Sequence, residues 1–319
     1  MPSPLAAPAA RTLVLSFCNG PTDEAGEPLA PPPALPHLAA LLGRLDRLAT
    51  EPGEVEDPIP PHERALARAW GGSAELPPPL AAARARALGL QPSADEAWGL
   101  LQPVHWAVGR EHVRMGDPEA LGLDEAAGRE VFDAIAPLFR SAGWALHWGG
   151  PTAWFLVHPD LDGLATASPD RVIGRNPDRW MPEARAARSF RRLQAEVQMT
   201  LYTHPLNAAR EARGLPVVNS VWLSGCGKPQ PVAPGVIHLD ALRAPSLAQD
   251  VAAWQAAWQQ LDAGPLAQAL ADLQAGQALS LWLCGERQAA HFGPRPRGWL
   301  QGLRARWQAP APAAVLAAL

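Results

Sequence analysis

Polar side chains gather between residues 207 and 227 in a pattern that could bind a small anion. Asn207 and Arg210 are three residues apart, so a helix would place both side chains on one face. An arginine in that position can hold a carboxylate or phosphate through two parallel hydrogen bonds. The simpler alternative is that Arg210 pairs with an acidic side chain of the protein itself.

A glycine-rich segment follows this helix after a short apolar run. Residues 217–224 predict a buried strand whose carboxyl end enters a turn of Gly225, Cys226 and Gly227. Ligands of open parallel sheets bind just beyond such strand ends, and glycine lets backbone N–H groups approach an anion closely. Asn219 is polar inside an otherwise apolar strand, so a ligand site stands beside the simpler alternative of a helix cap and a tight turn, and the sequence does not decide between them.

Other candidate ligand-binding residues lie outside this segment. His204 precedes a proline that breaks the helix, so it is the histidine expected nearest the site. Arg171 and Arg175 form a small basic loop that could add to an anion site. Cys226 could act as a nucleophile with His204, although a buried structural cysteine is the simpler reading. We assign no catalytic residue and no metal ligand from these patterns.

Helices alternate with short apolar strands along most of the chain, which predicts an α/β fold. Strands are expected in residues 12–18, 235–239 and 278–284, and they favour a three-layer, mainly parallel sheet. Residues 93–180 predict an inserted α+β subdomain with the order β-α-β-β. The first part of the α/β core, with proline-rich linkers, is then 1–92, and the remainder is 181–319.

Composition excludes several classes of function for the 319-residue chain. Its net charge of −4 argues against sequence-independent nucleic-acid binding, and no apolar run is long enough to span a bilayer. The first residues do not read as a secretory leader. Three widely spaced cysteines cannot form a disulfide framework, which favours a reducing, cytoplasmic location.

Several segments resemble known families. HPLNAAREARGLPVVNSVWLSGCG is similar to the helix–strand segment of archaeal-type, cofactor-independent phosphoglycerate mutases, which belong to the alkaline phosphatase superfamily. The segments HWAVGREHVRMGDPEALGLDE, GWALHWGGPTAWF and RVIGRN resemble a bacterial group of phosphoglycerate mutase-like proteins, the regulators of pathogenicity factors of type E. This second resemblance covers most of residues 95–290, and it implies an alkaline-phosphatase-like sheet.

The superfamily resemblance also implies a pair of divalent metal ions held by aspartates and histidines. The aspartate expected after the first strand is replaced by Asn19, although Asp23 follows four residues later. The last strand ends in Cys284, Gly285 and Glu286 rather than in an Asp-His pair. Amide and thiol groups do not replace hard carboxylate ligands, so the two-metal site is expected to be degenerate.

The sequence therefore favours a catalytically degenerate, phosphoglycerate mutase-like protein that binds a small phosphorylated or carboxylated ligand in a regulatory role, without a cofactor. One alternative is an active mutase-type isomerase or phosphohydrolase with two Mn, Zn or Mg ions. Another is a protein–protein interaction module built on a tryptophan-rich subdomain, with tryptophans at positions 106, 144, 148 and 154.

Overall fold

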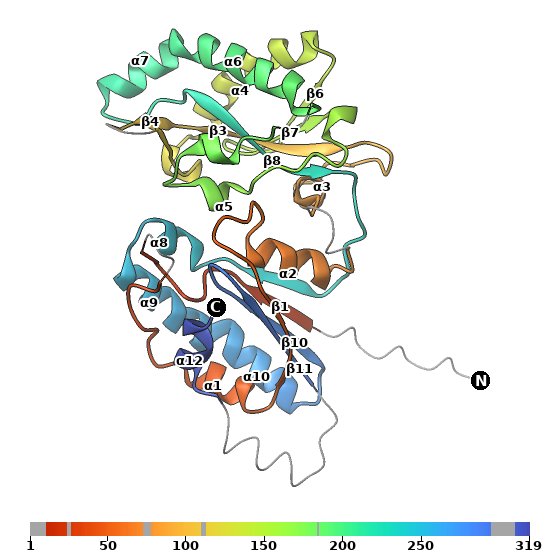
Figure 1. Ribbon diagram of the computed structural model, residues 1–319, viewed down its shortest axis with the longest axis vertical. Coiled ribbons are helices and arrows are strands. Elements are labelled where there is room, and N and C mark those ends of the chain that lie inside the picture. Colours follow the sequence, from red (N-terminus) through yellow and green to blue (C-terminus); the bar gives the residue numbers. More distant parts are fainter. Residues whose placement is uncertain (1–10, 24–26, 73–77, 110–112, 184, 295–309) are drawn as a thin grey trace, which may run out of the picture. The chain divides into compact units, whose positions relative to one another are not determined.

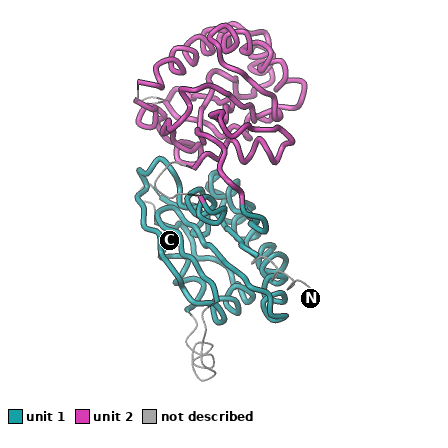
Figure 2. Tube along the Cα trace, turned by 90° about the vertical axis from the view of Figure 1, so that its right-hand side faces the viewer, with its two compact units in different colours: residues 1–71, 233–319 teal, residues 72–232 magenta. Residues whose placement is uncertain are grey.

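The computed structural model describes residues 11–23, 27–72, 78–109, 113–183, 185–294 and 310–319. The chain forms two compact units, shown in different colours in Figure 2. Unit 1 contains residues 1–71 and 233–319, and unit 2 contains residues 72–232. The inserted unit is thus longer at both ends than the expected 93–180, because residues 80–87 and 187–202 pack on its sheet and residues 220–227 form one of its strands.

Unit 1 is built on a five-stranded sheet with the order β2-β11-β10-β1-β9 (Figure 1). Its parallel strands are β1 (Arg11–Leu15), β9 (Val236–Leu239) and β10 (Leu279–Cys284). The antiparallel strands β11 (Ala289–Gly293) and β2 (Asp46–Glu51) extend one side of the sheet. The three parallel strands confirm the strands that the sequence predicts in these regions.

Helices cover both faces of this sheet. Leu13, Leu15, Leu281 and Leu283 alternate along β1 and β10 and point into one apolar core. The helices on that side are α1 (Pro36–Leu42), α8 (Arg243–Leu247), α9 (Val251–Leu261), α10 (Ala267–Gln274) and α12 (Pro312–Ala317). On the opposite face α2 (Pro61–Ala69) packs against Val14 and Trp282. The expected α/β class is therefore confirmed, with a sheet that is only partly parallel.

Unit 2 contains a four-stranded sheet in which every neighbouring pair is antiparallel. Its order is β6 (Ala145–Trp148), β7 (Trp154–Val157), β3 (Trp98–Val104) and β8 (Ser220–Gly227). A small hairpin of β4 (Trp106–Val108) and β5 (Val113–Met115) follows β3. The strand expected at 217–224 therefore begins and ends later than predicted, and it does not belong to a parallel sheet.

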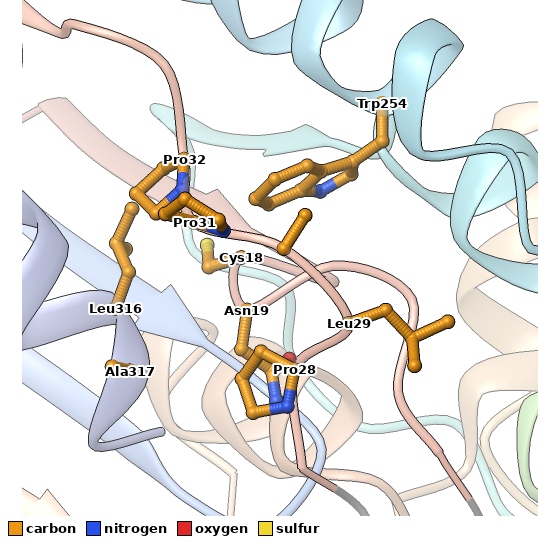
Figure 3. Close-up of a pocket in the computed structure, with 10 residues that line it drawn as sticks. Cys18, Asn19, Pro28, Leu29, Pro31, Pro32, Trp254, Leu316 and Ala317 are labelled. Carbon is orange, nitrogen blue, oxygen red and sulfur yellow. The ribbon is translucent and has the colours of Figure 1, made fainter.

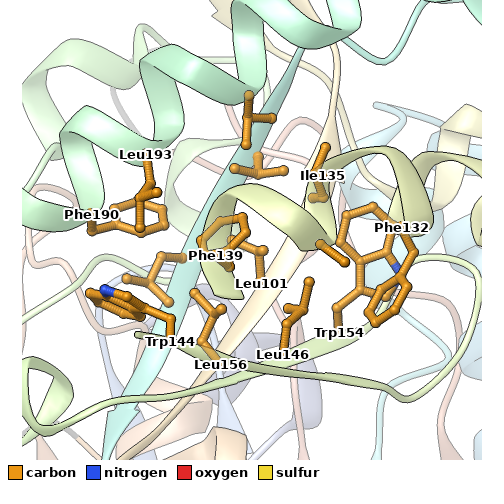
Figure 4. Close-up of a cluster of buried hydrophobic side chains, with 14 of the residues drawn as sticks. Leu101, Phe132, Ile135, Phe139, Trp144, Leu146, Trp154, Leu156, Phe190 and Leu193 are labelled. Atoms are coloured by element: carbon orange, nitrogen blue, oxygen red, sulfur yellow. The ribbon is translucent and has the colours of Figure 1, made fainter. Parts of the chain in front are cut away.

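Two long helices pack on this sheet and complete the core of unit 2 (Figure 4). They are α4 (Glu125–Ser141) and α6 (Ala187–Tyr202). The unit also contains the shorter helices α3 (Leu80–Ala87), α5 (Pro169–Val172) and α7 (Pro205–Ala212). The core includes Phe132, Phe139, Trp144 and Trp154, all almost completely buried. Two of the four tryptophans of the predicted interaction module therefore hold the unit together internally.

A buried carboxylate organises the beginning of α1 in unit 1. Asp262 accepts hydrogen bonds from the backbone N–H groups of His37 at 3.2 Å and Leu38 at 2.8 Å, and from His37 Nδ1 at 2.9 Å. These bonds replace an N-cap side chain, because the residue at the cap position is Leu35. Asp262 opens a π-helical turn, Asp262–Leu266, in which Pro265 lacks the N–H that a regular α-helix would use.

Replacing Asp262 by alanine should lower the free energy of unfolding by about 3 kcal/mol, because buried donors at the start of α1 lose their acceptor. The matched control is Asp250→Ala. Asp250 caps α9 through one exposed hydrogen bond, from Ala253 N at 2.9 Å, and its loss should cost about 1 kcal/mol. Urea unfolding measures both; equal losses would show that burial of Asp262 adds nothing to its capping role.

Candidate functional site

The glycines of the predicted anion-binding turn lie inside β8 and are covered by α3. Gly225 has φ +61°, and an added Cβ would lie 2.9 Å from the backbone nitrogen of Ala81. A Cβ on Gly227 would lie 3.1 Å from the Cβ of Pro79. The two glycines therefore allow α3 to approach the strand closely, and the predicted open crevice at this turn is wrong.

The side chains of Asn207 and Arg210 bind the protein's own backbone. Asn207 donates to the carbonyls of Leu201 at 2.8 Å and Val218 at 2.7 Å, and it accepts from Val218 N at 2.9 Å. Arg210 Nε donates to the carbonyl of Pro216 at 2.7 Å, and its Nη2 donates to that of Leu121. Both residues are more than nine-tenths buried, so they brace the connection into β8 rather than face a ligand.

Asn219 lies just before β8, and its side chain continues the hydrogen bonding between β3 and β8 beyond the end of the two strands. Its Oδ1 accepts from Trp106 N at 2.7 Å, and its Nδ2 donates to Trp106 O at 3.0 Å. The amide thus reproduces the donor and acceptor of a backbone peptide group where the ladder ends. The polar residue within the apolar strand has a structural role, which corrects its prediction as part of a ligand site.

The remaining predicted residues are dispersed in unit 2. His204 caps α7, because its Nδ1 accepts a hydrogen bond from Leu206 N at 3.3 Å. The same Nδ1 lies 3.8 Å from Glu130 Oε1. Arg171 is buried in α5, and the backbone carbonyl of Arg175 accepts from Met115 N at 3.1 Å. Burial raises the pKa of the Cys226 thiol to about 12, which disfavours the reactive thiolate.

A different site lies in unit 1, where the chain leaves β1. Phe17 adopts φ +57°, a conformation that is costly for a bulky residue, and its carbonyl accepts from Gly20 N at 3.1 Å. The indole of Trp254 donates to the same carbonyl at 3.2 Å, and that of Trp258 donates to Cys18 O at 3.3 Å. These two side chains of α9 hold the turn of residues 17–20 in place.

This turn presents Asn19 to a pocket of about 320 Å³. The other lining residues are Cys18, Pro28, Leu29, Ala30, Pro31, Pro32, Trp254, Leu316 and Ala317, and Figure 3 shows them. Asn19 as a whole residue is only 6% exposed. No hydrogen bond of its side chain is found among the described residues, and its amide is not one of the fully buried polar atoms without a partner, so the amide keeps access to the space of the pocket. A polar group that lines a pocket and makes no protein hydrogen bond is available to a ligand.

The same end of β1 carries a second polar group on the face covered by α2. Ser16 Oγ lies 3.3 Å from His238 Nε2, and the ring of His62 lies parallel to that of His238 at 6.0 Å. Nowhere among the described residues do three or more His, Cys, Asp or Glu side chains gather closely enough to hold a metal ion. Neutral Asn19, Cys18 and Ser16 therefore do not fit the metal pair that the superfamily resemblance implies.

Sequence reasoning identified Asn19 only as a replaced metal ligand and did not identify the pocket. The signal was present in two places. Asn19-Gly20-Pro21 follows a buried strand, and Trp254 and Trp258 are four residues apart, which places both indoles on one face of a helix. The pairing of these distant segments could not be read from their local patterns.

Comparisons with known proteins give a distant structural likeness. No family model and no curated protein matches the chain. A protein structure from Pyrococcus horikoshii is 11% identical, with a TM-score of 0.47, over 89% of this chain and 87% of that one. A cofactor-independent phosphoglycerate mutase from Thermoplasma acidophilum is 15% identical, with a TM-score of 0.38, over 91% and 90% of the two chains. Likeness at this level carries no argument about activity.

Substitution of Gly225 by alanine should destabilise the protein by about 3 kcal/mol, through the positive φ and the contact with the Ala81 backbone. Gly122→Ala is the matched control, because Gly122 has φ +58° with no neighbour within 4 Å, and it should cost about 1–2 kcal/mol. Chemical unfolding compares the two. A Gly225→Ala protein as stable as the control would contradict the packing of α3 on this glycine.

Native Cys226 should resist alkylation by iodoacetamide. Burial raises the pKa of the thiol to about 12, so the reactive thiolate is scarce near neutral pH, and the sulfur itself is buried. Reactivity should rise as pH approaches this pKa or when denaturant unfolds the chain. Mass spectrometry of the modified peptide measures the rate; rapid labelling of the folded protein would contradict the buried position of the thiol.

Proposed function

We propose that this chain is a phosphoglycerate mutase-like α/β protein that binds a small molecule in the pocket beside Asn19, in a regulatory rather than a catalytic role. The observation that carries the proposal is the amide of Asn19, which lines the pocket, keeps access to it and makes no hydrogen bond among the described residues. The pocket lies past the carboxyl end of a parallel strand, which is the usual position of ligands in α/β sheets.

The chemistry of the pocket wall favours binding over catalysis. The ten described residues that line the pocket include no side chain with a carboxylate, imidazole, guanidinium or ammonium group. Cys18 is the one nucleophilic type among them, and burial raises the pKa of its thiol far above the ordinary value. Among the described residues, the wall therefore offers neither a general acid or base nor an activated nucleophile.

The two alternative functions receive less support from the described structure. An active metal-dependent mutase would need ligands that residues 16–19 do not provide. A tryptophan-based interaction surface would need exposed indoles, yet Trp144 and Trp154 are buried and Trp106 and Trp148 pack partly against apolar clusters. We therefore retain small-molecule binding, and the ligand site moves from the predicted 204–227 segment to the end of β1.

Ligand-observed NMR with a library of small fragments tests this function. Ala317→Trp should block the pocket, whereas Ala314→Trp adds the same bulk to an exposed position of α12 that does not line it. We expect fragments that bind the wild type and Ala314→Trp but not Ala317→Trp.

Assays of metal content and of 3-phosphoglycerate turnover accompany the screen. After incubation with Mn, Mg or Zn, the amount of metal bound to the purified protein and the rate of 3-phosphoglycerate turnover should both stay at background. Stoichiometric metal with mutase turnover, or a screen in which no fragment distinguishes Ala317→Trp from the wild type, would contradict the proposal.

A further inference from the structure

Resting on the proposed function, we infer that the ligand of the Asn19 pocket is neutral and carries a carboxamide-type group on a compact apolar body. A carboxamide-type group here means one hydrogen-bond acceptor placed beside one donor. The inference follows from which polar atoms of the pocket wall remain available to a ligand and which the protein itself already uses.

Two of the polar side chains in the wall are already engaged. Trp254 donates its indole N–H to Phe17 O, so it offers the ligand only its ring. The Cys18 thiol lies 3.4 Å from Leu15 O and donates to that carbonyl. Asn19 is the remaining polar side chain among the lining residues, and it is the one without a protein partner in the described structure.

The segment of residues 28–32 makes the wall poor in hydrogen-bond donors. Pro28, Pro31 and Pro32 have no backbone N–H, and the N–H of Leu29 donates to Pro21 O at 2.9 Å. Anion sites in proteins depend on several converging N–H groups or on a cationic side chain. A phosphate or carboxylate would therefore gain few hydrogen bonds from the described residues of the wall to compensate for its lost hydration.

The amide of Asn19 has a specific complement. A primary amide presents a carbonyl acceptor and an N–H donor side by side in one plane, and a second amide can satisfy both groups at once. The volume of about 320 Å³ lies near the lower limit for small-molecule sites, so the ligand is compact. The proline rings, Leu29, Leu316 and the indole of Trp254 supply the apolar contacts.

Benzamide, benzoate and toluene form a matched set of probes, because they share a ring and differ in the group that would meet Asn19. NMR titration of each into the purified full-length chain at neutral pH gives the three dissociation constants. Benzamide should bind about tenfold or more tightly than benzoate and toluene. The inference is overturned if benzoate binds as tightly as benzamide, or if no binding of benzamide is detected.

Variants of Asn19 link this preference to one side chain. Asn19→Leu should reduce the affinity for benzamide to that for toluene, while toluene binding is retained. Asn19→Asp keeps the shape of the side chain, so it guards against misfolding, and it should weaken benzamide and exclude benzoate further. Unchanged benzamide affinity in both variants overturns the inference.

The Ala317→Trp and Ala314→Trp variants separate the two claims. Probe binding that is lost only in Ala317→Trp, but that shows no preference for benzamide, leaves the proposed function standing and rejects the ligand class. Probe binding that is equal in both variants rejects the pocket itself, and with it the proposed function.

Discussion

Two indole N–H groups on one helix hold the turn on which the candidate site depends. Trp254 and Trp258 donate to the carbonyls of Phe17 and Cys18, which lie some 240 residues earlier in the chain. These bonds stabilise a left-handed conformation at Phe17 that would otherwise be unfavourable. Gly20 must be glycine here, since an added Cβ would lie 2.7 Å from the Trp254 ring. Asn19 is therefore placed by contacts that leave its own amide unused.

Much of the secondary structure could be predicted because it depends on local patterns. The helix at Glu125–Ser141 begins after Asp124, a residue type that favours the N-cap position, and the Asp124 side chain accepts a hydrogen bond from Ala127 N. The buried strands β1 and β10 follow from short apolar runs. Strand direction is a property of distant pairing, and the prediction of one mainly parallel sheet was wrong for β8, which pairs antiparallel with β3.

The predicted ligand residues show why residue type alone does not define a site. Asparagine, arginine and glycine bind anions through the same donors and backbone freedom that they use to join segments of a fold. In unit 2 the donors of Asn207 and Arg210 bind carbonyls, and the freedom of Gly225 lets α3 approach. The distinguishing observation is whether a polar group already has a protein partner, and a sequence does not contain it.

The division of unit 1 between residues 1–71 and 233–319 has a consequence for synthesis on the ribosome. The central strand β1 and helix α1 emerge early, but β9 and β10, the strands on either side of β1, and Asp262, the cap of α1, are translated only after the whole of unit 2. Unit 2 is continuous and can fold first. Until then β1 has no partner strand at either edge, and its apolar side chains are not covered by α9 and α10. The nascent chain is therefore expected to need protection from aggregation during this interval.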